Sequence, residues 1–209
     1  MKHLSRTAFA ACALFAIKLQ ASPTVINFNS DPDNSYFVGS VTSQGFVFTP
    51  GANSNMGTMS NFDGEGQTDG SIYLGSWSND SDATLLSFQA TDSSLFSLQS
   101  FDFDNAYASG GSRTNSLTIT GTYQNATTTS ETFSNLTNVL GFEELDLNSS
   151  FQGLTNVSVT ADGETNTRAL FDNFTVNGSA AAPDSGATVA MFGTALLCLA
   201  ALRRKFASA

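Results

Sequence analysis

The side chains that most often do covalent or metal chemistry occur only near the two ends of this sequence. Histidine is found once, at His3, and the two cysteines are Cys12 and Cys198. Residues 22–186 contain no histidine, cysteine or lysine. For this stretch the composition excludes Ser-His-Asp and Cys-His nucleophiles, Schiff-base chemistry and zinc sites built on imidazole or thiolate. It also excludes disulfides, so a folded core must supply the stability.

Carboxylates are the remaining candidates for catalysis. Asp102 and Asp104 form one close pair, and Glu143 is followed by Glu144 and Asp146. A glycosidase needs two carboxylates that face each other across a cleft at a defined separation, and neighbours on one strand do not meet this requirement. The sequence therefore predicts a protein that is not an enzyme, with a glycoside hydrolase as the least favoured alternative.

Two acidic stretches have oxygen ligands at alternate positions, the arrangement that suits calcium. They are residues 29–35 and residues 63–70. The second stretch resembles the start of an EF-hand loop, but Thr68 stands at the glycine position and Leu74 at the closing glutamate position. It is therefore not an EF-hand, and ordinary solvated turns are the favoured interpretation of both stretches.

A lone carboxylate in the last predicted strand gives a sharper hypothesis. Strict alternation would put Leu170, Asp172, Phe174 and Val176 on one inward face. An unpartnered buried carboxylate would cost on the order of 5 kcal/mol, so Asp172 needs a partner. The candidates are Arg168, Arg113, backbone amides at a sheet edge, or a structural calcium ion shared with Asn27 or Asn29. A hydrogen-bonded or ion-paired aspartate is favoured, and calcium is the alternative.

The elements that must position these groups are short strands. From Thr24 onward, alternating β-branched and aromatic residues are separated by Gly, Asn, Asp and Ser clusters, and no helical period is seen. The predicted strands are Thr24–Phe28, Gly45–Thr49, Ser71–Gly75, Thr84–Gln89, Leu95–Phe103, Ser116–Tyr123, Ser130–Phe133, Glu143–Leu147, Leu154–Thr160 and Ala169–Val176. We expect an all-β fold, a single antiparallel β-sandwich or jelly roll over residues 22–179. Its 18 phenylalanines would fill the space between two sheets.

Aromatic side chains could also bind sugars if they are exposed. The candidates are Trp77, Tyr36, Tyr73, Tyr107 and Tyr123. Each could equally be a packing residue. Trp77 is the first choice for a sugar contact, because Ser76, Ser78 and Asn79 flank it.

The start of the sequence has the layout of a secretory signal peptide. Lys2 and Arg6 precede an apolar run from Thr7 to Ile17, and the small residue Ala21 follows. The run is too short for a spanning helix, which needs about 20 residues. We predict a signal peptide at residues 1–21; the alternative is an N-terminal core helix.

The other end has an uncharged apolar run followed by a basic cluster. Ala187 to Leu202 contains no charged residue, and Arg203, Arg204 and Lys205 come directly after it. This order predicts a transmembrane helix at residues 187–202 and a basic cytoplasmic tail at residues 203–209, with the preceding residues outside the cell. A buried globular helix is the alternative.

The charge between these ends is strongly negative. Residues 22–185 hold two basic and eighteen acidic side chains, a net charge of −16. Such a surface repels phosphate backbones and anionic lipids, so nucleic acid is excluded as a partner.

The residues Pro183-Asp184-Ser185-Gly186, the apolar run and the basic cluster together resemble the VPDSG-CTERM variant of the PEP-CTERM sorting signal. The resemblance covers about 25 residues, with Ala182 where the family usually has valine. It makes residues 180–186 the linker and sorting motif. It also implies export to the cell envelope or surface, processing by an exosortase, which is a membrane enzyme with a catalytic cysteine, and a link to exopolysaccharide production.

A weaker likeness concerns the predicted closing strand Leu170 to Val176, whose Asp172-Asn173 pair is similar to that of carbohydrate-binding jelly rolls. In those proteins the aspartate often helps to hold a structural calcium. The preferred interpretation is an exported, noncatalytic surface or extracellular-matrix protein. The alternative is a carbohydrate-binding module that contacts extracellular polysaccharide.

Overall fold

The computed structural model describes residues 22–33, 35–60, 71–78, 80, 82–105, 114–136, 141–163 and 167–178. Within these ranges every regular element is a β-strand, which confirms the predicted all-β class. The predicted signal peptide, linker and sorting motif, transmembrane helix and basic tail lie outside these ranges. The described part of the chain has no helix with the length and apolarity that a membrane span requires.

The strands are short and follow one another through turns. They are β1 (Thr24–Ile26), β2 (Ser35–Val38), β3 (Val41–Ser43), β4 (Phe46–Pro50), β5 (Ser54–Met59), β6 (Tyr73–Ser78), β7 (Asp82–Ala90), β8 (Phe96–Asp104), β9 (Thr114–Tyr123), β10 (Thr128–Ser134), β11 (Glu143–Asp146), β12 (Leu154–Gly163) and β13 (Thr167–Gly178). All ten predicted strands are present with shifted ends, whereas β2, β3 and β5 were not predicted.

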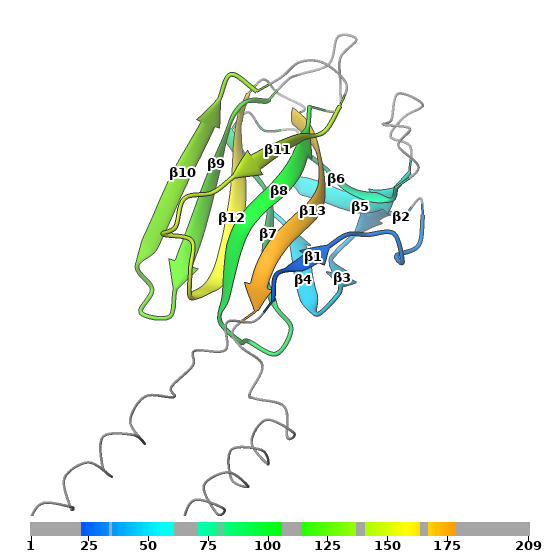
Figure 1. Cartoon of the computed structure of the whole chain (residues 1–209). Coiled ribbons are helices and arrows are strands. Elements are labelled where there is room, and N and C mark those ends of the chain that lie inside the picture. Colours follow the sequence, from blue (N-terminus) through cyan, green and yellow to red (C-terminus); the bar gives the residue numbers. More distant parts are fainter. Residues whose placement is uncertain are drawn as a thin grey trace, which may run out of the picture. The chain divides into compact units, whose positions relative to one another are not determined.

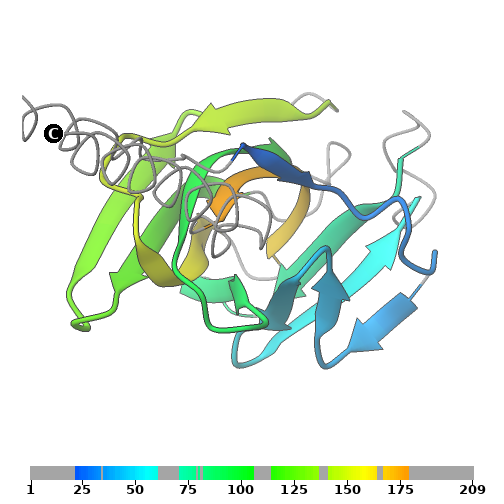
Figure 2. The same cartoon turned by 60° about the horizontal axis from the view of Figure 1, so that its bottom comes forward.

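The strands form two antiparallel layers, as Figures 1 and 2 show. One layer has the order β2-β5-β6-β13-β8, with β11 on the free side of β8 and β1 beside the second half of β13. The other has the order β3-β4-β7-β12-β9-β10. The pair Leu154 and Phe96 joins the layers along one side. The prediction of an antiparallel β-sandwich is therefore confirmed, with the sandwich nearly closed at this seam.

Phenylalanine rings fill the space between the layers, as predicted. The phenylalanines of this main core are Phe28, Phe46, Phe48, Phe88, Phe96, Phe101, Phe103, Phe151, Phe171 and Phe174. Phe174 lies among several of them, with ring centroids 5.2 Å from Phe88, 5.3 Å from Phe48 and 5.4 Å from Phe101. Apolar burial and ring contacts of this kind stabilise a domain whose residues 22–186 contain no cysteine to form a disulfide.

The predicted alternation along the last strand is wrong, because β13 contains a bulge. Asn173 has a φ of 49°, and the register with β8 shifts between Asp172 and Thr175. Phe171 and Phe174 therefore both face the main core, although they are three residues apart. Asp172 points to the other side of the sheet, together with Leu170.

That other side carries a second, smaller apolar cluster. Met59, Tyr73 and Leu170 are fully buried there, and Trp77 and Phe142 pack against them. Asp172 is 2% exposed, so its burial is confirmed even though its predicted face is not.

Candidate functional site

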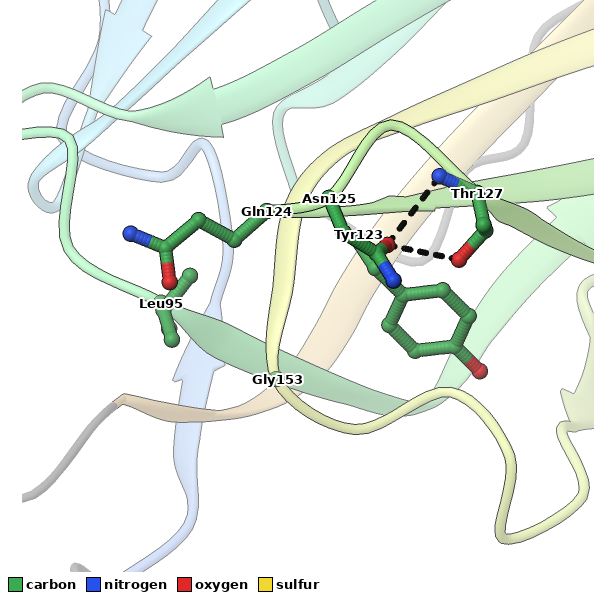
Figure 3. A pocket seen from close by; sticks show the side chains of 6 residues that line it. All are labelled: Leu95, Tyr123, Gln124, Asn125, Thr127 and Gly153. Carbon is green, nitrogen blue, oxygen red and sulfur yellow. Dashed lines mark hydrogen bonds between the residues drawn. The ribbon is translucent and has the colours of Figure 1, made fainter.

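An open depression of about 620 Å³ lies where three turns of the sandwich meet. Tyr123, Gln124, Asn125 and Thr127 come from the end of β9 and the turn that follows it. Leu95 directly precedes β8, and Gly153 directly precedes β12. Figure 3 shows these six residues around the depression, which we call the Tyr123 depression.

The turn between β9 and β10 sets the shape of one wall. The Tyr123 N–H donates to the Thr127 carbonyl at 2.9 Å, and the Ala126 N–H donates to the Tyr123 carbonyl at 2.9 Å. Ala126 completes the turn in the left-handed region, with a φ of 63°. Asn125 Oδ1 accepts hydrogen bonds from the Thr127 N–H at 3.1 Å and its hydroxyl at 2.6 Å, drawn as dashed lines in Figure 3. The Asn125 side chain is therefore held in one orientation by its oxygen.

The Tyr123 ring is held from the opposite side. Its hydroxyl donates to the Ser150 carbonyl at 2.6 Å, and the half-buried ring packs against the main core. The segment that carries Ser150 is fixed in turn. The Asn148 N–H donates to Glu131 Oε2 of β10 at 3.0 Å, and Asn148 Oδ1 accepts from the Ser150 N–H at 2.9 Å. The ring is thus positioned before any ligand arrives.

The remaining groups of the depression are uncharged. None of its six lining residues carries an ionisable acid or base apart from the phenol. In the described structure, the Gln124 side-chain amide and Asn125 Nδ2 make no hydrogen bond, so both face solvent with their capacity unused. Gly153 has a φ of 69°, and the space where its side chain would start is open. The depression is therefore not narrowed by a side chain at this position.

A carboxylate lies near this end of the sandwich but does not line the depression. Asp92 is in the turn between β7 and β8, and Asp92 Oδ1 accepts from the Ser94 N–H at 2.9 Å. Hydrogen bonds from the Ser94 hydroxyl and then its N–H hold the pKa of Asp92 below its ordinary value of 3.8. The group is therefore ionised at neutral pH.

Trp77, the first predicted sugar contact, lies on β6 opposite Asn55 of β5 and Arg168 of β13. Its side chain is half-buried and packs against the second apolar cluster. Its role in sugar binding stays a prediction. Tyr73 is fully buried and is a packing residue, while Tyr107 and the side chain of Tyr36 lie outside the described residues.

The residues proposed to share a calcium ion are engaged with other groups. Asp172 Oδ1 accepts from the Asn173 N–H at 2.8 Å. Asn29 Oδ1 accepts from the Ile72 N–H at 2.9 Å, and Asn27 Oδ1 accepts from Gln44 Nε2 at 3.3 Å. Oxygen donors of this type suit calcium, but an ion would have to share or displace these hydrogen bonds.

No three Asp, Glu, His or Cys side chains gather as a metal-binding group within the described ranges. Arg113 and the acidic stretch at residues 63–70 are outside those ranges. Calcium binding at Asp172 therefore stays a prediction.

The acid pairs predicted from the sequence occupy neighbouring strands of one sheet. Glu144 of β11 lies opposite Asp102 of β8, and Asp102 lies opposite Asp172 of β13. Asn173 Nδ2 donates to Asp102 Oδ2 at 2.8 Å, which adds a polar link across the bulge. Directly opposed residues of a sheet stand side by side on one face of it, with Cβ atoms about 5 Å apart. This arrangement does not supply two carboxylates on either side of a cleft.

Most of the Tyr123 depression was missed by sequence reasoning. Tyr123 was among the aromatic candidates, but its neighbours Gln124 and Asn125 were not, and Leu95 and Gly153 are about 30 residues away in the sequence on either side. The available signal was the polar turn Gln124-Asn125 directly after an aromatic strand residue.

Among solved structures, three similar folds are an exo-β-agarase, the arabinose-bound α-L-arabinofuranosidase MgGH51, and the CBM22-1–GH10 modules of xylanase 10B from Clostridium thermocellum complexed with xylohexaose. Each is 13% identical, with TM-scores of 0.46, 0.44 and 0.39. They cover 77%, 76% and 70% of this chain, and the matches span 25%, 31% and 28% of the respective solved chains. The chain thus matches less than a third of each, and at this similarity the comparison says nothing of activity.

No curated protein matches the chain. The family model of the VPDSG-CTERM motif matches residues 183–206, a range that includes the predicted motif from Pro183 to Gly186 and the basic residues from Arg203 to Lys205. A motif of this kind implies processing by an exosortase-type enzyme. The chain therefore carries a PEP-CTERM-like sorting signal and is an exported protein of the cell surface or extracellular space.

Proposed function

We propose that this chain is a noncatalytic surface or extracellular-matrix protein. In this proposal the C-terminal tail holds the protein in the membrane until an exosortase processes the chain near the sorting motif. The observation that carries the proposal is the sorting signal at residues 183–206. The composition supports the noncatalytic part, because residues 22–186 contain no histidine, cysteine or lysine. Reactions that depend on an imidazole, a thiolate or an amine nucleophile are closed to such a domain.

The proposed order of events follows from the charges at the end of the sequence. The apolar run from Ala187 to Leu202 stops in the membrane, and the basic cluster stays on the cytoplasmic side. Pro183 favours an extended backbone in the residue before it, which presents the motif to the processing enzyme as an extended peptide. Cleavage near the motif then separates the β-sandwich from the apolar run.

Mass spectrometry of the mature protein tests this proposal, in cells with and without the exosortase. We expect the segment from Ala187 to Leu202 to be absent from the mature protein only when the enzyme is present. A variant with Asp184→Ala should keep the segment, whereas Asp162→Ala, a change of the same type at an exposed position of β12, should be processed normally. Retention of the segment in both strains would refute processing.

The noncatalytic part is tested separately. The purified protein is incubated with polysaccharides and the release of reducing ends is measured; none is expected. Release that disappears in Asp102→Asn or Glu144→Gln would make the chain a glycoside hydrolase and end this part of the proposal.

A carbohydrate-binding module is the second candidate function. The observation that favours it is the uncharged Tyr123 depression, with two side-chain amides and a fixed aromatic ring. Aromatic rings and a few placed polar groups are the usual components of a sugar site.

A further inference from the structure

We infer that the Tyr123 depression is a binding site for an uncharged saccharide unit of an extracellular polysaccharide. This inference deepens the second candidate function above and depends on it. It assigns the contact to the turn after β9 and not to Trp77, the residue that the sequence favoured.

The first argument is the match between the lining groups and a sugar. A pyranose presents apolar C–H faces and a rim of hydroxyls, each of which can donate and accept hydrogen bonds. The Tyr123 ring and Leu95 supply apolar surface in the depression. The Gln124 amide can donate and accept at once, and Asn125 Nδ2 can donate. Neither group is used within the described part of the protein, so both are available to hydroxyls.

The second argument is that the site is formed in advance. The Tyr123 hydroxyl is held by the Ser150 carbonyl at 2.6 Å, and Asn125 Oδ1 is held by the Thr127 hydroxyl at 2.6 Å. A ligand therefore does not need to immobilise the ring or the turn, and this lowers the entropy cost of binding.

The third argument concerns charge. The six lining residues offer no cation to an anionic ligand, and residues 22–185 have a net charge of −16. Uronate or sulfate groups would meet repulsion without a compensating ion pair. The depression therefore selects neutral saccharides over acidic ones.

The volume sets the expected size and strength of the contact. At about 620 Å³ the depression is within the usual range of about 300 to 1,000 Å³ for small-ligand sites. It is open to solvent, so much of a bound sugar would stay hydrated. Binding of single oligosaccharides should accordingly be weak, in the micromolar to millimolar range of Kd, and a long polymer would gain from repeated contacts with several copies.

The test uses the full chain in detergent micelles and isothermal titration with two sets of probes. The neutral set is cellohexaose, xylohexaose, laminarihexaose and agarohexaose, and the acidic set is oligogalacturonate and oligoalginate. We expect at least one neutral probe to bind and neither acidic probe to bind. Gln124→Ala should weaken binding by about tenfold or more, because it removes the exposed amide without touching the core.

Two further variants sharpen the result. Tyr123→Phe keeps the ring but frees it from Ser150, so we expect weaker binding with the same preference among the probes. Gln89→Ala removes an exposed amide from β7, outside the depression, and should bind as the unchanged chain does. Thermal unfolding of each variant shows whether the fold is intact. If Tyr123→Phe unfolds, the result depends on Gln124→Ala, because Gln124 is exposed and its substitution leaves the core unchanged.

Two outcomes would overturn the inference. Binding that is lost in Trp77→Ala and kept in Gln124→Ala would move the site to β6 while leaving the carbohydrate-binding function intact. An absence of binding to every probe would end both the site and the carbohydrate-binding function. The sorting and processing of the surface protein, measured by mass spectrometry as above, would be unaffected by either outcome.

Discussion

The substitution Phe174→Ala tests whether the phenylalanine core stabilises this disulfide-free domain. Phe174 is fully buried directly after the bulge in β13. Five phenylalanine rings have centroids within 6.3 Å of its own: Phe28, Phe48, Phe88, Phe101 and Phe171. Truncation of Phe174 to alanine would therefore remove five ring contacts at once.

The magnitude follows from the cavity that the change would leave. Truncating a buried phenylalanine to alanine costs about 3 to 5 kcal/mol, and the cost rises when the neighbours cannot move into the space. The neighbours here are rigid rings on five different strands or turns, so we expect the upper half of this range, about 4 to 5 kcal/mol. For a domain of this size, each kcal/mol lowers Tm by about 2 to 4 °C, which predicts a fall of roughly 8 to 20 °C.

Thermal and urea unfolding, followed by circular dichroism, measure this change. Val25→Ala is the control, because Val25 is 44% exposed on β1, the strand beside Phe174, and should cost less than about 1 kcal/mol. Phe174→Leu fills most of the space and should fall between the two. A loss below about 1.5 kcal/mol in Phe174→Ala, similar to that of the control, would refute the view that this ring cluster is the stabilising core.

Three further predictions concern the turns and the proposed ion. Ala126 has a φ of 63°, so Ala126→Gly should raise the free energy of unfolding in urea by about 0.5 to 1 kcal/mol, whereas Ala90→Gly, in a buried strand position, should lower it. Because the pKa of Asp92 is lowered on folding, its contribution to stability is present above pH 3.8 and is lost as pH falls through its folded value. Asp92→Asn should therefore lower Tm slightly at pH 7 and have a smaller effect as the carboxylate becomes protonated in acid, and an equal effect at neutral and acidic pH would contradict this cause. If the predicted calcium site exists, millimolar calcium should raise the Tm of the unchanged chain, with magnesium and Asp172→Asn showing no shift; equal Tm values with and without calcium would remove it.

Period two is clearest in a strand that has one buried and one solvated face. β9 alternates buried Leu117 and Ile119 with half-exposed threonines, and period two predicts it well. β5 was missed because its last four residues, from Met56 to Met59, are all buried. Burial on both faces removes the alternation on which the prediction depends.

The error at Asp172 has a different cause. A single extra residue in a bulge moves every later side chain of a strand to the other face. The only sign of the bulge in the sequence is the residue type of Asn173, because asparagine tolerates the left-handed region better than most residues. In the structure Asn173 does adopt that region. Burial of Asp172 could be predicted from its apolar surroundings, but the side of the sheet could not.

The Tyr123 depression could not be predicted because its walls come from turns that meet only in the folded chain. Tyr123 and Leu95 are 28 positions apart, and Gly153 is 30 positions further on. Sequence patterns report the neighbours of a residue along one strand, whereas a site of this kind depends on which turns lie at the same end of a sandwich.

Under the proposed function, in which the protein is held at its C-terminal tail and binds a polymer, the seam at Phe96 has a mechanical consequence. The Phe96 backbone pairs with Leu154 of the second layer and with Gly178, the last strand residue before the chain continues toward the sorting signal. Leu95, one residue earlier, lines the Tyr123 depression. Tension between a held polymer and the tether would therefore run through a few residues at this corner, and the phenylalanine core would carry little of the load.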